Sequence, residues 1–131
     1  MNGASSLTFT GRIRSFRCAF KGIRVMIRSQ HNAWLHAIAT CLVVGFAWYF
    51  RLTTYEWCLI IFAVIAVWTA EALNTAFEFL TDVASPDFHP LAEKAKDVAA
   101  GAVLIVALGS VVIGLLVFGP HPAQIGRRTI P

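Results

Sequence analysis

The stretch that decides the fold is residues 56–83, EWCLIIFAVIAVWTAEALNTAFEFLTDV, an apolar run long enough to cross a membrane. As a helix rising about 1.5 Å per residue it is roughly 42 Å long, more than a hydrocarbon core of about 30 Å. Two acidic side chains, Glu71 and Glu78, lie well inside or toward the end of this run. A carboxylate at membrane depth costs several kcal/mol, so it points to a functional site.

Four polar side chains recur with helical spacing at the end of this run. They are Glu71, Asn74, Glu78 and Asp82. At about 100° per residue, these positions form a stripe on one face of a helix. Further along the chain, Lys96 and Asp97 begin the next apolar stretch and bring an amine and another carboxylate to the same membrane surface. The sequence therefore predicts a site that contains both signs of charge.

The composition is that of a small integral membrane protein. Of the 131 residues, 57% are hydrophobic and 14% are charged, whereas soluble domains carry about 25% charged residues. The net charge is +4, but the basic residues follow membrane topology, so we expect no nucleic-acid binding. The three cysteines are widely separated, which gives neither a disulfide framework nor a zinc pattern.

We expect an all-α membrane protein with one membrane-embedded domain over residues 1–118 and a flexible tail over residues 119–131. An amphipathic helix over residues 9–29 is suited to lie in the membrane interface. Three spans are predicted after it, over residues 33–50, 56–83 and 98–118. The basic residues concentrate before the first span, which places the N-terminus and the acidic loop in the cytosol.

The acidic stripe is suited to phosphoryl transfer. Carboxylates at the headgroup level bind Mg²⁺, which in turn binds nucleotide phosphates, and phosphoryl transfer needs chiefly positioning and charge stabilisation. The deeply placed Glu71 then acts as general base on a lipid hydroxyl, and Glu78 binds metal. Lys96 meets a phosphate, and Asp97 accepts from an adenine amine or a ribose hydroxyl. No P-loop or kinase catalytic-loop pattern occurs in the sequence.

The same residues permit other interpretations. Lys96 and Asp97 are also typical of a polar cap at the start of a helix, with the lysine snorkelling to the interface. The stripe from Glu71 to Glu78 is compatible with a non-enzymatic module, such as a small proton or ion conduit or an assembly factor. Residues 9–29 could instead pack on a soluble partner.

Three stretches resemble the signature of the prokaryotic diacylglycerol kinase and undecaprenol kinase family. They are EALNTAFE at 71–78, followed by Asp82, then HPLAEKAKD at 89–97 and VAAGAVLI at 98–105. The resemblance extends from about Phe16 to Phe118. It implies a homotrimer of three-span subunits with an interfacial N-terminal helix. It also implies transfer of the γ-phosphate of ATP to a lipid alcohol, with Mg²⁺, at the cytosolic surface of the inner membrane.

The resemblance implies individual roles as well. Glu71 matches the general base of the family, Asn74 the amide beside it, and Glu78 a metal-binding glutamate. Nucleotide contacts are implied for Lys96, Asp97, His89, Asp87, Phe88 and, through a looser alignment, Arg12.

The chain departs from the family pattern at two positions. Gln30 stands where a second metal-binding glutamate is usual, and an amide oxygen can bind Mg²⁺ but brings no charge. Cys18 stands where a nucleotide-contacting tyrosine is common. The stretch HNAWLH at 31–36 and the start of the third span resemble the undecaprenol kinase branch. We therefore expect undecaprenol as acceptor, with diacylglycerol as the alternative and a member inactivated through Gln30 as a third possibility.

Overall fold

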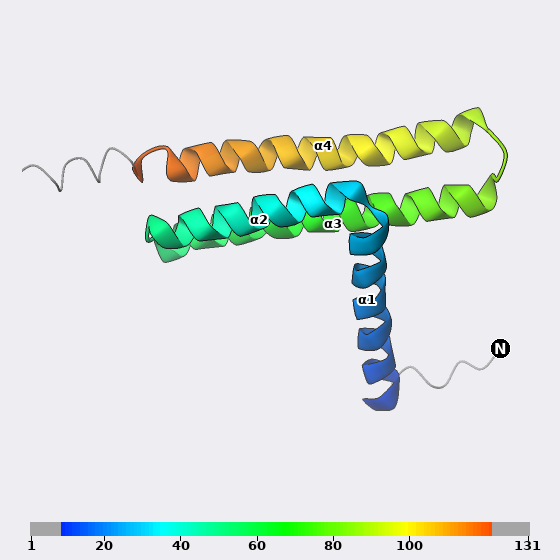
Figure 1. The fold of residues 1–131 in the computed structure, drawn as a ribbon, viewed down its shortest axis with the longest axis horizontal. Helices are drawn as coiled ribbons and strands as arrows, with labels where there is room; N and C mark the ends of the chain where they lie inside the picture. Colours follow the sequence, from blue (N-terminus) through cyan, green and yellow to red (C-terminus); the bar gives the residue numbers. More distant parts are fainter. Residues whose placement is uncertain (1–8, 122–131) are drawn as a thin grey trace, which may run out of the picture.

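The computed structural model describes residues 9–121, which form four α-helices (Figure 1). The helices are α1 (Phe9–Ser29), α2 (His31–Tyr49), α3 (Thr54–Ala84) and α4 (Pro90–Phe118). Helices α2, α3 and α4 run side by side, whereas α1 leaves this bundle at a steep angle near the start of α2 (Figure 1). The expected tail lies, from residue 122 onward, outside the described residues, and so do residues 1–8.

Three of these helices are long and apolar enough to cross a membrane, namely α2, α3 and α4. This confirms the predicted all-α fold with three spans and an N-terminal helix. Helix α3 has 31 residues and α4 has 29, so each is over 40 Å long and exceeds the hydrocarbon core. The end of α3 and the beginning of α4 continue past the level at which α1 leaves the bundle (Figure 1).

Helix α4 begins at Pro90, whereas hydropathy alone placed the start of the third span at residue 98. The earlier start has a local cause. Pro90 occupies the first turn, where its missing N–H is not needed. In addition, Nδ1 of His89 accepts a hydrogen bond of 3.2 Å from the backbone N–H of Leu91. Lys96 and Asp97 therefore lie inside α4, so a cap at a helix start does not describe them.

The packed end of the bundle lies away from the stripe of Glu71, Asn74, Glu78 and Asp82. Helix α3 begins with a capping box, in which Oε2 of Glu56 accepts from the backbone N–H of Thr53 at 2.7 Å. Helices α3 and α4 form the most extensive contact of the bundle, and α2 packs chiefly on α3. The buried apolar cluster at this end consists of Ala47, Leu52, Ile60 and Val117. It holds the three spans together where α2 ends and α3 begins.

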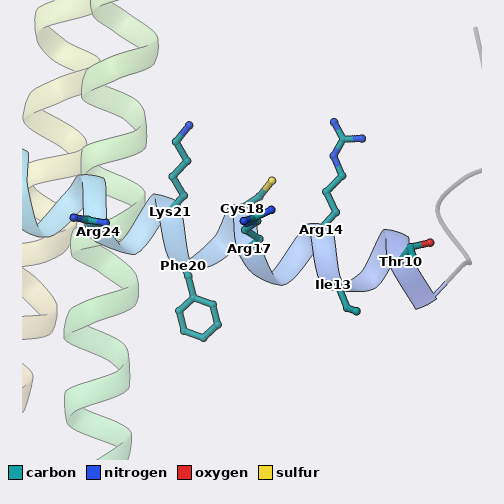
Figure 2. Close-up of a pocket in the computed structure, with 8 residues that line it drawn as sticks. All are labelled: Thr10, Ile13, Arg14, Arg17, Cys18, Phe20, Lys21 and Arg24. Carbon is teal, nitrogen blue, oxygen red and sulfur yellow. The ribbon is translucent and has the colours of Figure 1, made fainter.

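Helix α1 is amphipathic over its described length. Ile13 and Phe20 point to one side of the helix, and Arg14 and Lys21 point to the opposite side (Figure 2). An apolar face opposite basic side chains is the arrangement of a helix that lies in a membrane interface. Met26, near the end of α1, is buried where the helix meets the bundle.

Candidate active site

Glu71 is the most deeply buried polar side chain among the described residues. Its side chain is 0% exposed, and within residues 9–121 neither carboxylate oxygen has a hydrogen-bond partner. His36 of α2 lies beside it, with Nε2 at 3.7 Å from Oε2 of Glu71. Buried polar groups are normally satisfied, so an unpartnered carboxylate inside a membrane span marks a functional position.

The predicted stripe continues from Glu71 toward the end of α3. Asn74 is buried, and its Nδ2 donates a hydrogen bond of 3.1 Å to Oε1 of Glu78. Its Oδ1 is buried without a partner in the described part of the chain. Because positions four apart face the same side of a helix, this contact follows directly from the sequence spacing. The stripe thus presents a free carboxylate, a free amide oxygen and a second carboxylate in succession.

Gln30 meets this stripe from the junction between α1 and α2. Its Nε2 donates a hydrogen bond of 2.5 Å to Oε2 of Glu78. Gln30 is the N-cap residue of α2 but makes no capping bond with its side chain, because the amide is turned toward α3. The structure therefore brings together the two residues that the resemblance assigns to metal binding.

These donors fit a magnesium ion. Residues 9–121 contain no cluster of three His, Cys, Asp or Glu side chains placed to hold a metal. The oxygen donors here are instead one carboxylate, from Glu78, and the amides of Gln30 and Asn74. Mg²⁺ takes oxygen ligands and is usually held by one or two carboxylates, with water and substrate phosphates as its other ligands. The buried, unpartnered Oδ1 of Asn74 is an additional oxygen donor beside the carboxylate.

A pocket of about 230 Å³ lies beside Glu71 between α2, α3 and α4. Its polar lining comes from α2 and α3, and its apolar lining includes α4. The lining residues are Asn32, Leu35, His36, Glu71, Asn74, Ala100, Val103, Leu104 and Ala107. This pocket gives a small polar group, such as a hydroxyl, access to the buried carboxylate.

An apolar groove of about 290 Å³ continues from this pocket toward the packed end of the bundle. The groove and the pocket share two lining residues, His36 and Ala107. Beyond them the groove is walled by α2, α3 and α4 as far as Phe46 and Phe118. A molecule with a polar head and a long apolar chain therefore matches the two spaces together.

A third pocket, of about 290 Å³, lies at the loop between α3 and α4. Lys96 lines it together with three predicted nucleotide contacts from the loop, Asp87, Phe88 and His89. The Nζ atom of Lys96 forms an ion pair of 2.5 Å with Oδ1 of Asp82, and the two side chains are 40% and 62% exposed. Such an exposed pair contributes little to stability, so the amine can exchange its partner for a phosphate.

Two predicted nucleotide contacts lie outside this loop pocket. Asp97 is exposed and does not line it. Arg12 is exposed in the first turns of α1, a part of the helix that stands away from the bundle (Figure 1). Within one chain the structure therefore groups Glu71, Asn74, Glu78 and Gln30, and separately the loop residues with Lys96.

Sequence reasoning did not assign His36 to the site. The residue appeared only within the stretch HNAWLH, which was used to choose between branches of the family. A histidine in the second turn of a membrane span was the available signal, because ionisable residues inside a span face the bundle interior and pair with one another.

Comparisons with known proteins identify relatives over most of the chain. Residues 17–118 match the family described as prokaryotic diacylglycerol kinase. The undecaprenol kinase of Bacillus subtilis (strain 168) is 40% identical over 82% of this chain and 87% of its own length. The diacylglycerol kinase of Synechocystis sp. (strain ATCC 27184 / PCC 6803 / Kazusa) is 34% identical over 76% of this chain and 58% of its own length. That of Escherichia coli (strain K12) is 27% identical over 86% and 93%.

A three-span fold whose buried carboxylate adjoins a polar pocket and an apolar groove defines an integral membrane enzyme that acts on an amphipathic molecule. The chain belongs to the prokaryotic diacylglycerol kinase family, and it is a lipid kinase. This confirms the prediction of an enzyme over that of a non-enzymatic membrane module.

Proposed function

We propose that the chain transfers the γ-phosphate of ATP to the hydroxyl of a membrane lipid alcohol, and that undecaprenol is the preferred alcohol. The observation that carries the proposal is the buried Glu71 carboxylate, which has no hydrogen-bond partner among residues 9–121 and borders a pocket between three spans. A general base must lie within hydrogen-bond reach of the proton that it removes. A hydroxyl in this pocket meets that requirement.

The reaction involves one proton transfer and one displacement. Glu71 accepts the proton of the lipid hydroxyl, and Asn74, whose Nδ2 donates to Oε1 of Glu78, holds the second carboxylate of the stripe in place. The alcohol oxygen forms a bond to the γ-phosphorus while the bond to the β,γ-bridging oxygen breaks, which leaves ADP. The proton on Glu71 then returns to solvent through the polar pocket.

Lys96 and the loop residues Asp87, Phe88 and His89 are assigned to the nucleotide. The support is that all four line the loop pocket beyond the end of the acidic stripe. An ammonium group there attracts phosphate oxygens, and the loop covers them. Lys96 would leave Asp82 when the nucleotide binds, at small cost because both side chains are exposed.

Glu78 and Gln30 are assigned to Mg²⁺, with Gln30 presenting its amide oxygen in place of the N–H group that now faces Glu78. When bound, Mg²⁺ neutralises charge on the nucleotide phosphates. The amide of Gln30 brings no charge, so within this pair only the carboxylate of Glu78 attracts the metal ion electrostatically.

The apolar groove supports undecaprenol as acceptor. Undecaprenol is a single long apolar chain that ends in a hydroxyl, and the groove continues as one path from the pocket beside Glu71 to Phe118. The similarity to the undecaprenol kinase of Bacillus subtilis supports the same choice. Diacylglycerol, with two chains, is the alternative acceptor.

We place the protein in the inner (cytoplasmic) membrane as a homotrimer, with its N-terminus and active site in the cytosol. The basic α1 supports this orientation, because basic residues beside a first span stay on the cytosolic side. Large apolar side chains of α4, such as Ile105 and Leu116, are more than 70% exposed in one chain. Neighbouring subunits and lipid would cover them. We assign Arg12 and Asp97, which do not line the loop pocket of their own chain, to the site of a neighbouring subunit.

The test is phosphate transfer from labelled Mg·ATP to undecaprenol and to diacylglycerol, side by side in mixed micelles, with Glu71→Gln as control. We expect transfer to undecaprenol to be the faster reaction and to be lost in Glu71→Gln. Faster transfer to diacylglycerol would show that diacylglycerol is the preferred acceptor and would leave the proposed phosphate transfer unchanged. No transfer to either lipid by the wild-type protein would refute the proposed function.

A further inference from the structure

We propose that His36 is a positioning residue for Glu71, which holds the buried carboxylate at the junction of the polar pocket and the apolar groove. The inference rests on the proposed function, in which Glu71 is the general base. His36 lines both spaces, and its Nε2 lies 3.7 Å from Oε2 of Glu71. At 17% exposure its side chain is mostly enclosed.

The separation of 3.7 Å between Nε2 of His36 and Oε2 of Glu71 lets His36 orient the carboxylate without forming a hydrogen bond to it. It exceeds the range of a hydrogen bond between nitrogen and oxygen, so both carboxylate oxygens remain free to accept from a substrate hydroxyl. At the same time, a polar ring beside the carboxylate restricts the positions that the buried side chain can take. His36 can thus orient Glu71 without occupying the atom that takes the proton.

Thr40, one helical turn after His36, connects the backbone of α2 to α3. The hydroxyl of Thr40 donates to the carbonyl oxygen of His36 at 2.7 Å and accepts from Nε1 of Trp68 at 3.1 Å. Trp68 precedes Glu71 by about one helical turn. Helix α3 therefore contacts α2 at two successive turns, through Trp68 and Thr40 and through Glu71 and His36. This pair of contacts sets the register of α2 against α3 and places the imidazole opposite the carboxylate.

Few other charges act on this pair. From α3, Glu78 is the second acid that faces Glu71. From α4, the pocket is lined by Ala100, Val103, Leu104 and Ala107, which do not titrate. Helix α1 does not line it. His36 is therefore the basic side chain that the described helices bring beside Glu71.

The bundle contains a matched control. At its opposite end, Nε2 of His121 lies 3.6 Å from Oε1 of Glu56, the same residue types at nearly the same separation but far from the stripe. We compare His36→Ala, His36→Gln and His121→Gln in micelles with Mg·ATP and undecaprenol. The measured quantities are kcat, the KM for ATP and the pH profile of kcat.

We expect His36→Ala to lower kcat about a hundredfold with little change in the KM for ATP, since small misplacements of a reacting group cost about that much. His36→Gln should restore part of kcat because its side chain again places a polar group beside Glu71, but the pH profile should change because an amide does not titrate. His121→Gln should match the wild type. An unchanged pH profile and equal kcat in both His36 variants, with only thermal stability lowered, would overturn the proposal.

Two further measurements separate this inference from the proposed function. If the wild-type protein transfers phosphate and Glu71→Gln does not, the proposed function stands whatever the His36 variants do. Independently of activity, the nitrogen NMR signals of the His36 imidazole should change in Glu71→Gln, while those of His121 should not. Unchanged His36 signals in a folded Glu71→Gln protein would overturn the inference even if no lipid substrate were accepted.

Discussion

The side-chain amide of Gln30 donates a hydrogen bond of 2.5 Å to the carboxylate of Glu78, although 48 residues separate the two in the sequence. This contact ties the junction of α1 and α2 to the acidic stripe of α3. An amide at this position avoids the repulsion that a second carboxylate would cause, and its hydrogen bond to Glu78 stabilises the protein without metal.

Gln30→Glu should make the protein bind Mg²⁺ more tightly and make it less stable when Mg²⁺ is absent. Two carboxylates at this distance repel each other in the absence of metal, and together they attract Mg²⁺ more strongly than one does. We expect the Mg²⁺ concentration for half-maximal activity to fall on the order of tenfold. The melting temperature without Mg²⁺ should fall as well. A magnesium titration of activity, with melting curves at each concentration, measures both quantities. An identical titration in the two proteins would show that Gln30 does not contact the metal.

Glu71→Gln should abolish phosphate transfer while the protein stays folded. The substitution keeps the shape of the side chain but removes the proton acceptor, which contributes at least about a hundredfold to the rate. A neutral amide is also easier to bury than a charge, so the melting temperature should not fall. Glu56→Gln is the matched control, because glutamine preserves the capping box at the start of α3. Retained turnover in Glu71→Gln would show that another group is the base.

Lys96→Met should weaken nucleotide binding with little loss of stability. Its ion pair with Asp82 is exposed, and such pairs contribute at most about 1 kcal/mol. A lost hydrogen bond to a charged phosphate costs about 1.5–3 kcal/mol, so the KM for ATP should rise roughly tenfold or more.

Asp82→Asn is the control for this prediction, because it removes the competing carboxylate and leaves the amine in place. It should leave the KM for ATP unchanged or lower it. A similar rise of KM in both variants would show that the ion pair, rather than a phosphate contact, is what matters. Steady-state kinetics at saturating lipid distinguishes these outcomes.

Gly114→Leu should narrow the apolar groove and slow turnover of undecaprenol. Gly114 lines the groove, and a Cβ built there meets no atom within 4 Å, so the backbone can accept the substitution. The added side chain would compete with the lipid chain for the same space. We expect kcat/KM for undecaprenol to fall about tenfold, the effect of roughly two methylene groups at ~0.8 kcal/mol each.

Gly109→Leu, on the same helix, is the matched control. Its Cβ also meets no atom within 4 Å, and Gly109 does not line the groove. Both substitutions raise helix propensity by a similar amount, so any difference between them reports on the groove. Equal kcat/KM values would mean that the lipid chain lies elsewhere. The measurement is phosphate transfer with undecaprenol as the varied substrate.

The helices were predictable where local physics decides them. An apolar run of sufficient length must form a helix in a membrane, because every backbone polar group needs an internal partner there. The range of the N-terminal helix followed from its amphipathic period, and the structure has α1 at Phe9–Ser29. Helix α4 begins eight residues before the apolar span predicted from residue 98, because hydropathy measures apolar character and not where a helix begins. Helix initiation at Pro90 depends instead on the N-cap contact of His89.

What the sequence by itself determined is the stripe of Glu71, Asn74 and Glu78, because residues at helical spacing share a face whatever surrounds the helix. What only the tertiary structure decided is which groups from other helices meet that face. Gln30 reaches Glu78, and His36 reaches Glu71, because α2 packs on α3 in one register set by buried contacts. The residues that contact these acids are therefore set by packing between helices, which local periodicity does not encode.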